Sequence, residues 1–147
     1  LLAWLGDDEL LQRAGLDVDD RSHLRQTIPA TEVVEPAAAD DLWQRRKSLF
    51  FKPVDGFGSK AAYRGDKLTR TTFEHILAHR YVAQTLAPTS FRRIQSADGA
   101  EADLRVDVRN YAMHGATWLR AARLYRGQTT NFRTVGGGFA PVLTLPA

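Results

Sequence analysis

The sequence predicts an α+β fold in which antiparallel strands dominate and helices are few. Residues 1–47 contain short helix-like segments interrupted by prolines, and from residue 48 onward apolar and aromatic runs typical of strands take over. In addition, the run DLRVDVR alternates apolar and charged residues with a period of two. This alternation is typical of a half-buried strand, so Leu104, Val106 and Val108 are expected to face a core.

The first 47 residues predict an acidic, helical connector. A helix is expected to begin after Asp7 or Asp8, whose side chains can accept from free backbone N–H groups, and to end at Gly15. The further elements expected here are a helix over 20–26, an extended TEVVE and a helix in AAADDLWQRRK.

Residues 48–147 are predicted to form the second part of the chain. The elements expected there are, in order, strands in SLFFKP and KAAYR, a helix over 71–79, and strands in YVAQTLAP, FRRIQ, DLRVDVRNYAM and ATWLRAARLYR. His114 and Gly115 are expected to form the turn between the last two strands, which makes them a long antiparallel hairpin.

Composition and charge exclude several classes of protein. The 147 residues include no cysteine, so disulfides, thiolate metal sites and cysteine nucleophiles are excluded. No apolar stretch is long enough to span a bilayer and the start lacks the pattern of a secretory signal, so we expect a cytoplasmic protein without a membrane partner. Residues 1–47 carry 6 basic and 10 acidic side chains, whereas residues 48–147 carry 14 and 7, so the second part is expected to bind anions.

A glycine-containing loop follows the strand that ends near Lys52. Its sequence, DGFGSK over residues 55–60, lets backbone N–H groups approach phosphate oxygens, and lysines flank it on both sides. The loop is not a Walker A motif, and Ala61 occupies the position of the third glycine of a dinucleotide fingerprint. A protein kinase has its glycine loop before its strand lysine, and the order here is the reverse.

The order of these segments resembles that of the ATP-grasp superfamily, most closely its glutathione-synthetase-like and circularly permuted members. The matching segments are FFKP, DGFGSK, AAYR, the following helix, YVAQTLAP, DLRV, AARL and TNFRTVGGG. The resemblance covers residues 49–142. It implies an ATP-grasp-like fold with antiparallel β-sheet lobes and a glycine lid loop, with residues 48–147 as an incomplete nucleotide-binding region. The activity it implies is an ATP-dependent carboxylate–amine ligase acting through an acyl phosphate, with ATP and Mg²⁺ as cofactors and a small-molecule carboxylate and amine as substrates.

The resemblance also implies a role for individual residues. Lys52 would contact the nucleotide phosphates, with Gly56, Gly58 and Ser59 closing over them as a mobile lid beside Lys60. The hinge strand would offer backbone groups to the adenine edge. In this sequence the hinge position is occupied by Gln84, Thr85 and Leu86. Arg105 and Arg123 match arginines that face the reaction centre, where guanidinium groups stabilise developing negative charge. The resemblance implies Asn131 as a third catalytic residue beside these two arginines.

The sequence departs from the family at the metal site. The Glu-x-Asn pair that normally helps to bind Mg²⁺ is absent, and Asn131, Asp103 and Asp107 are the remaining candidates. Each aspartate lies near an arginine in the sequence and is open to a second interpretation as an ion-pair partner. We therefore leave the metal ligands unassigned and expect an upstream part of the same protein to supply them. The chain alone is expected to be catalytically inactive.

Two other functions remain open. Residues 91–133 interleave eight arginines with aromatic residues, a pattern that also fits a single-stranded nucleic-acid-binding β module. That interpretation leaves Lys52 and the glycine loop unexplained, so nucleic acid is the less favoured partner. The missing metal ligands also fit a non-catalytic, nucleotide-binding regulatory domain.

Overall fold

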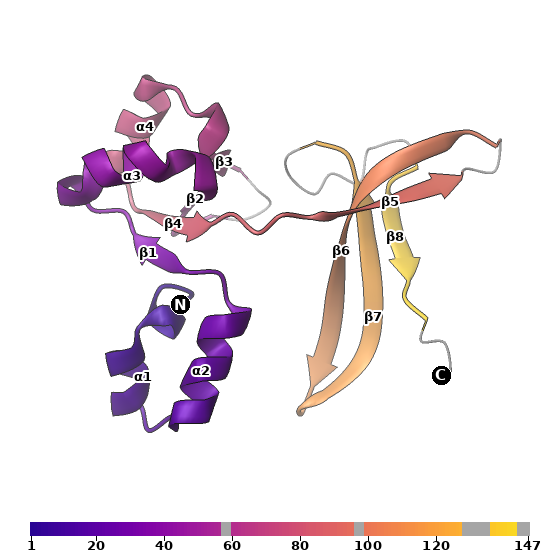
Figure 1. Ribbon diagram of the computed structural model, residues 1–147, viewed down its shortest axis with the longest axis horizontal. Helices are drawn as coiled ribbons and strands as arrows, with labels where there is room; N and C mark the ends of the chain where they lie inside the picture. The colour runs from indigo at the N-terminus through magenta and orange to yellow at the C-terminus, as the bar shows by residue number, and fades with distance from the viewer. Residues whose placement is uncertain (57–59, 96–98, 128–135, 144–147) are drawn as a thin grey trace. The chain divides into compact units, whose positions relative to one another are not determined.

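The computed structural model describes residues 1–56, 60–95, 99–127 and 136–143. The chain divides into two compact units, unit 1 (Leu1–Ala87) and unit 2 (Pro88–Ala147). Within the described residues, four α-helices belong to unit 1, and each unit contains one open, four-stranded antiparallel sheet (Figure 1). The predicted α+β class is confirmed at this level.

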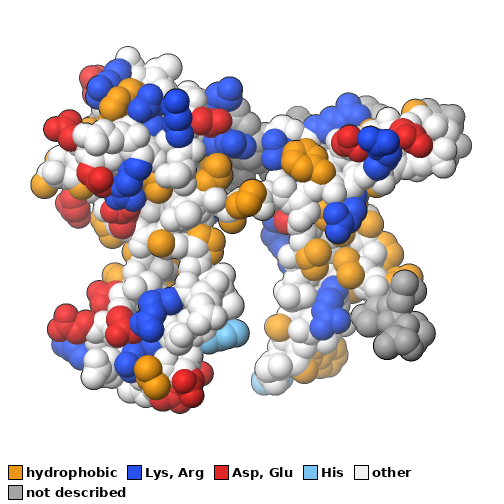
Figure 2. All heavy atoms as spheres, in the orientation of Figure 1, with side chains coloured by type: hydrophobic (Ala, Val, Ile, Leu, Met, Phe, Trp, Pro, Cys, Tyr) orange, Lys and Arg blue, Asp and Glu red, His pale blue; other side chains and the backbone are white. Residues whose placement is uncertain are grey.

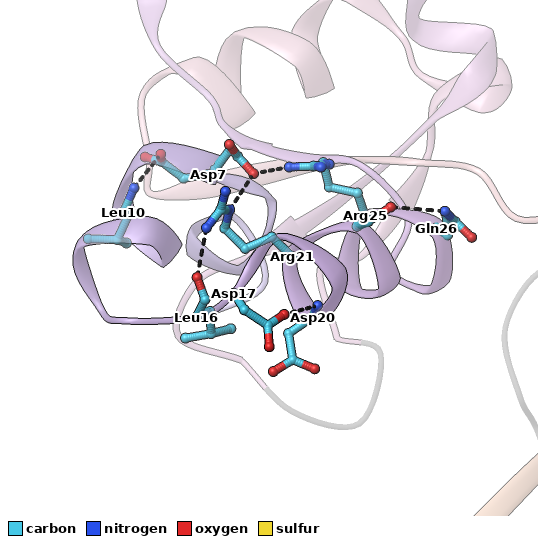
Figure 3. A network of polar contacts seen from close by, with 10 residues as sticks. Asp7, Leu10, Leu16, Asp17, Asp20, Arg21, Arg25 and Gln26 are labelled. Carbon is cyan, nitrogen blue, oxygen red and sulfur yellow. Dashed lines mark hydrogen bonds and ion pairs between the residues drawn. The ribbon is translucent and has the colours of Figure 1, made fainter.

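Unit 1 begins with a pair of short helices, α1 (Asp8–Arg13) and α2 (Val18–Thr27). The Asp7 carboxylate accepts from the backbone N–H of Leu10 at 3.0 Å, which confirms one of the two predicted caps. Asp17 caps α2 in the same way, and this helix therefore starts before the predicted residue 20. Figure 3 shows both caps, together with Arg21 and Arg25 of α2, which both pair with Asp8 of α1.

The sheet of unit 1 has the strand order β1-β4-β2-β3. Its strands are β1 (Thr31–Val33), β2 (Leu49–Pro53), β3 (Tyr63–Arg64) and β4 (Tyr81–Thr85). The two other α-helices of the unit are α3 (Ala39–Arg45) and α4 (Arg70–Leu77), and the short 3-10 helices are η1 (Trp4–Gly6), η2 (Pro36–Ala38), η3 (Arg46–Ser48) and η4 (Gly65–Lys67). The strand predicted in KAAYR is shorter than expected, because Ala61 has a left-handed backbone (φ 53°) that extended chain does not adopt.

One hydrophobic core joins residues from both sides of the expected division at residue 47. Leu42 of α3 and Phe51 of β2 are fully buried and belong to the same cluster as Ile76 of α4. The ring of Phe51 meets that of Phe73 edge to face, with 6.0 Å between their centroids. The part of the acidic segment from Val34 to Trp43 therefore packs with the strands that follow it, because its apolar side chains complete the core of their sheet.

The two faces of this sheet differ in chemistry. Leu49, Phe51 and Ala83 point into the core beneath α3 and α4. Successive residues of a strand alternate between faces, so the opposite face carries the intervening residues. The strand register groups them as Thr31 and Val33 of β1, Val82 and Gln84 of β4, Phe50 and Lys52 of β2, and Arg64 of β3. We call this set the polar face of the sheet.

Gly65 lies where η4 touches the backbone of η3. A Cβ at this position would be 1.8 Å from the carbonyl oxygen of Arg46 and 2.9 Å from that of Leu49. Both neighbours are backbone atoms, which cannot rotate away as a flexible side chain could. The close approach of the two segments therefore requires glycine.

Unit 2 contains the strands β5 (Ser90–Gln95), β6 (Glu101–Met113), β7 (Ala116–Tyr125) and β8 (Gly138–Pro141), in that order across the sheet. The predicted turn is confirmed, with positive φ at both His114 and Gly115. Leu104 is fully buried, but Val108 is 56% exposed, and its expected core position is wrong. Val108 lies past the part of β6 that pairs with β5, whose pairing ends at Val106.

Candidate functional site

Lys52 lies on the polar face of the sheet, one residue before the end of β2. Its ammonium group donates to Oε1 of Gln84 on the neighbouring strand β4, at 2.5 Å. The amine also lies 5.6 Å from the ring centroid of Phe50. Burial lowers the pKa of the Lys52 amine. The structure thus brings together two residues that were predicted to bind the nucleotide and are 32 positions apart in the chain.

Gln84 is buried, with 8% of its surface exposed, and its side chain is engaged at both ends. Besides accepting from Lys52, it donates through Nε2 to the hydroxyl of Thr31 on β1, at 2.8 Å. Thr31 is a residue that sequence reasoning missed. It lies 53 positions from Gln84, and only the pairing of β1 with β4 places the two side by side.

Thr85 and Leu86, which the resemblance places in a hinge, follow Gln84 at the end of β4. The backbone N–H of Thr85 donates to the carbonyl oxygen of Ala30, and that of Leu86 donates to the carbonyl oxygen of Ser48, both at 2.8 Å. These two N–H groups already have partners within unit 1. If the hinge meets an adenine edge, its carbonyl oxygens are the better candidates, since an oxygen can accept a second hydrogen bond.

The glycine loop leaves β2 directly after Lys52 and Pro53. Gly56 and Lys60 are exposed. Gly58 and Ser59, the other two residues of the expected lid, lie outside the described residues. A Cβ on Gly56 would lie 2.7 Å from Cγ of Pro53. On the far side of the loop, the Tyr81 hydroxyl donates to the carbonyl oxygen of Ala61 at 3.1 Å. The residue that follows the loop is therefore hydrogen-bonded to β4, a strand of the sheet that carries Lys52.

Unit 2 carries the two arginines predicted to face a reaction centre. Arg105 of β6 and Arg123 of β7 share one face of the sheet. Arg105 and Asp107 are two residues apart on β6 and therefore point to the same face, and Asp107 pairs directly with Arg123. The Arg105 guanidinium donates to the Thr89 hydroxyl at 2.9 Å and lies 4.8 Å from the ring centroid of Phe91. The hydrogen bond to Asp107 raises the pKa of Arg123. Asn131, the third predicted catalytic residue, lies outside the described residues.

The two candidate metal-binding aspartates are both paired with arginine. Asp103 accepts from Arg93 of β5 at 3.2 Å, and Asp107 pairs with Arg123 of β7. The partners come from adjacent strands and are not the sequence neighbours Arg105 and Arg109. Within the described ranges, no group of three or more histidine or acidic residues is placed to hold a metal ion. The described residues therefore do not fit a Mg²⁺ site, because each candidate carboxylate is already paired with a cation.

Unit 1 also contains a cavity of about 450 Å³. Trp4, Val33, Val54 and Val82 contribute apolar walls, and His79 and Arg80 add polar groups. None of the predicted nucleotide-binding residues lines it. The volume suits a small ligand. The cavity borders the polar face of the sheet, since Val33 and Val82 belong to that face and Val82 pairs directly with Lys52 in the β2–β4 register.

The exposed part of unit 2 combines apolar and basic side chains. Trp118 is 71% exposed, and Figure 2 shows hydrophobic and basic side chains together on the β6–β7 hairpin.

In the described part of the chain, no helix is long and apolar enough to cross a bilayer. Comparison with protein-family models, with curated proteins and with solved structures found no match to this chain.

Proposed function

We propose that this chain is the nucleotide-binding part of an ATP-dependent carboxylate–amine ligase of the ATP-grasp type. The observation that carries the proposal is the half-buried Lys52 amine, which Gln84 holds beside the start of the glycine loop. One N–H of the ammonium group is directed at Gln84, and among the described residues no hydrogen bond engages the other two, which are the donors proposed for phosphate oxygens. In a half-buried place such hydrogen bonds are stronger than in bulk water, which favours an anionic ligand.

In this proposal the arginines of unit 2 act on the reacting groups. Arg105 and Arg123 share a sheet face, and fixed guanidinium groups can stabilise the charge of an acyl phosphate and of the tetrahedral intermediate that an amine forms with it. The carboxylates that hold Mg²⁺ would belong to an upstream part of the same protein. The substrates are a small carboxylate and an amine.

Replacing Lys52 by alanine is expected to weaken ATP binding about 10- to 100-fold, the effect of losing hydrogen bonds between a charged donor and phosphate. Isothermal titration calorimetry at fixed ionic strength measures this change. Lys47→Ala is the matched control, since Lys47 is an exposed lysine of η3 and is not among the residues predicted to bind the nucleotide. An unchanged affinity in Lys52→Ala, or an equal loss in both variants, would contradict the proposal.

The isolated chain is expected to bind ATP without turning it over, because the described residues assemble no Mg²⁺ site. Phosphoryl transfer to a carboxylate needs a divalent metal to neutralise the phosphate charge. Trapping of acyl phosphates with hydroxylamine, at saturating Mg²⁺ and with a panel of amino acids, tests this expectation. Product formation by the 147 residues alone would mean that they contain the complete metal site.

A single-stranded nucleic-acid-binding module is the second candidate, and the exposed aromatic and basic residues of unit 2 favour it. Phe91, Tyr111 and Trp118 are 54%, 40% and 71% exposed, and the Arg109 guanidinium lies 5.9 Å from the ring centroid of Tyr111. Such a module would bind oligonucleotides with steep salt dependence and would not bind ATP.

A non-catalytic, nucleotide-binding regulatory domain is the third candidate. Nucleotide binding without turnover even in the full-length protein would indicate this function.

A further inference from the structure

Lys52 stands at the end of a chain of hydrogen bonds that crosses three strands. The Thr31 hydroxyl donates to the backbone carbonyl of Pro29 at 2.8 Å, and Gln84 Nε2 donates to the same hydroxyl at 2.8 Å. Gln84 Oε1 then accepts from the Lys52 ammonium group at 2.5 Å. Thr31 pairs directly with Gln84 in the β1–β4 register, and Gln84 and Lys52 lie diagonally across β4 and β2.

The direction of this chain is fixed by its two ends. A carbonyl oxygen can only accept, so the Thr31 hydroxyl must give its single hydrogen to Pro29. Its lone pairs then face Gln84 and select the NH₂ end of the amide. The amide oxygen consequently turns toward Lys52, where an ammonium group needs an acceptor. Chemistry alone therefore determines which end of the Gln84 amide meets Lys52.

We propose that Thr31 and Gln84 are positioning residues that hold the Lys52 amine toward an anionic ligand. This inference rests on the proposed function for the identity of that ligand, the polyphosphate of ATP. It assigns the Gln84 side chain to Lys52 and away from the nucleobase, because both ends of the amide are already engaged within unit 1. Thr31 acts only through Gln84.

The partner of Lys52 is the neutral amide of Gln84, and the nearby charged residues are paired with one another. Arg64 of β3 is the other charged residue of the described polar face, and its Nε lies 3.1 Å from Asp66. Arg80, which precedes β4, lies 3.4 Å from Asp55. Because burial lowers the pKa of the Lys52 amine, an oriented amide oxygen helps to keep the amine protonated without cancelling its charge.

The test measures the titration of Lys52 directly, in the full 147-residue chain. Trace labelling with acetic anhydride across a pH series, read by mass spectrometry, gives the pKa of Lys52 without any nucleotide. The variants are Thr31→Val, which removes the hydroxyl at nearly constant volume, Thr31→Ser, which keeps it, Gln84→Ala, Gln84→Glu, and Thr31→Val combined with Gln84→Ala. Circular dichroism confirms that each variant is folded before it is labelled.

The inference makes a different prediction for each variant. Thr31→Val and Gln84→Ala lower the pKa of Lys52, Gln84→Glu raises it, and Thr31→Ser stays close to wild type. Thr31→Val allows the Gln84 amide to turn its NH₂ toward Lys52, which disfavours the ammonium form. In the Gln84→Ala background, Thr31→Val has no further effect on Lys52. ATP binding weakens about 3- to 10-fold in Thr31→Val, the effect of one neutral hydrogen bond.

Two outcomes separate this inference from the proposed function. An unchanged Lys52 titration in Thr31→Val and Gln84→Ala would overturn the inference even if ATP binds. A shift of the Lys52 pKa in the expected directions, in a protein that does not bind ATP, would support the positioning role and contradict the proposed ligand. Additive effects of Thr31→Val and Gln84→Ala on Lys52 would overturn the role of Thr31.

Discussion

Replacing Gly65 with alanine is expected to lower the free energy of unfolding of unit 1 by about 3 kcal/mol, near the upper end for overpacked sites. The new Cβ would lie 1.8 Å from the carbonyl oxygen of Arg46, so η3 and η4 would have to move apart. The displaced segments flank Leu49, a buried core residue at the start of β2. Urea unfolding followed by tryptophan fluorescence measures the change, since Trp43 packs against this core.

Gly6→Ala is the matched control for this experiment. A Cβ on Gly6 would have nothing within 4 Å, and its backbone angle is not of the kind that requires glycine. Its effect on the free energy of unfolding is expected to stay within about 0.5 kcal/mol. If Gly65→Ala were as mild as Gly6→Ala, the tight packing of η4 against η3 would be wrong.

Phe51→Ala is expected to cost about 3–5 kcal/mol of folding free energy, as large-to-small changes of buried aromatic residues do. Phe51 is fully buried and meets Phe73 of α4 edge to face. Phe50 offers a control of the same residue type on the opposite face, where it is half-buried. We expect Phe50→Ala to cost about 1 kcal/mol. A larger cost at Phe50 than at Phe51 would show that the two faces of the sheet have been exchanged.

Features that depend on neighbouring residues could be predicted from the sequence. Asp7 caps α1 because a carboxylate can reach the N–H three residues ahead, and His114 with Gly115 turns the hairpin because the turn needs two residues of positive φ. The alternation in β6 predicted its strand but not where burial ends, since the exposure of Val108 depends on how far β5 extends.

Features that depend on strand pairing could not be predicted in this way. The sequence places Asp107 two residues from Arg105 and Arg109, yet its partner is Arg123, which the hairpin register brings opposite. Likewise Lys52 and Gln84 were each expected near a nucleotide, but their direct contact and the support from Thr31 arise only when β1, β4 and β2 form one sheet. The shared core of Leu42 and Phe51 was missed for the same reason.

The directional chain from Pro29 to Lys52 limits which sequences can keep this site during evolution. A relative with valine at position 31 loses the acceptor that orients the amide at position 84. Such a relative is expected to carry glutamate there, because a carboxylate presents an acceptor to Lys52 in either orientation. Threonine at position 31 should accompany glutamine at position 84. Positions 31 and 84 should therefore change together, although 53 positions separate them in the chain.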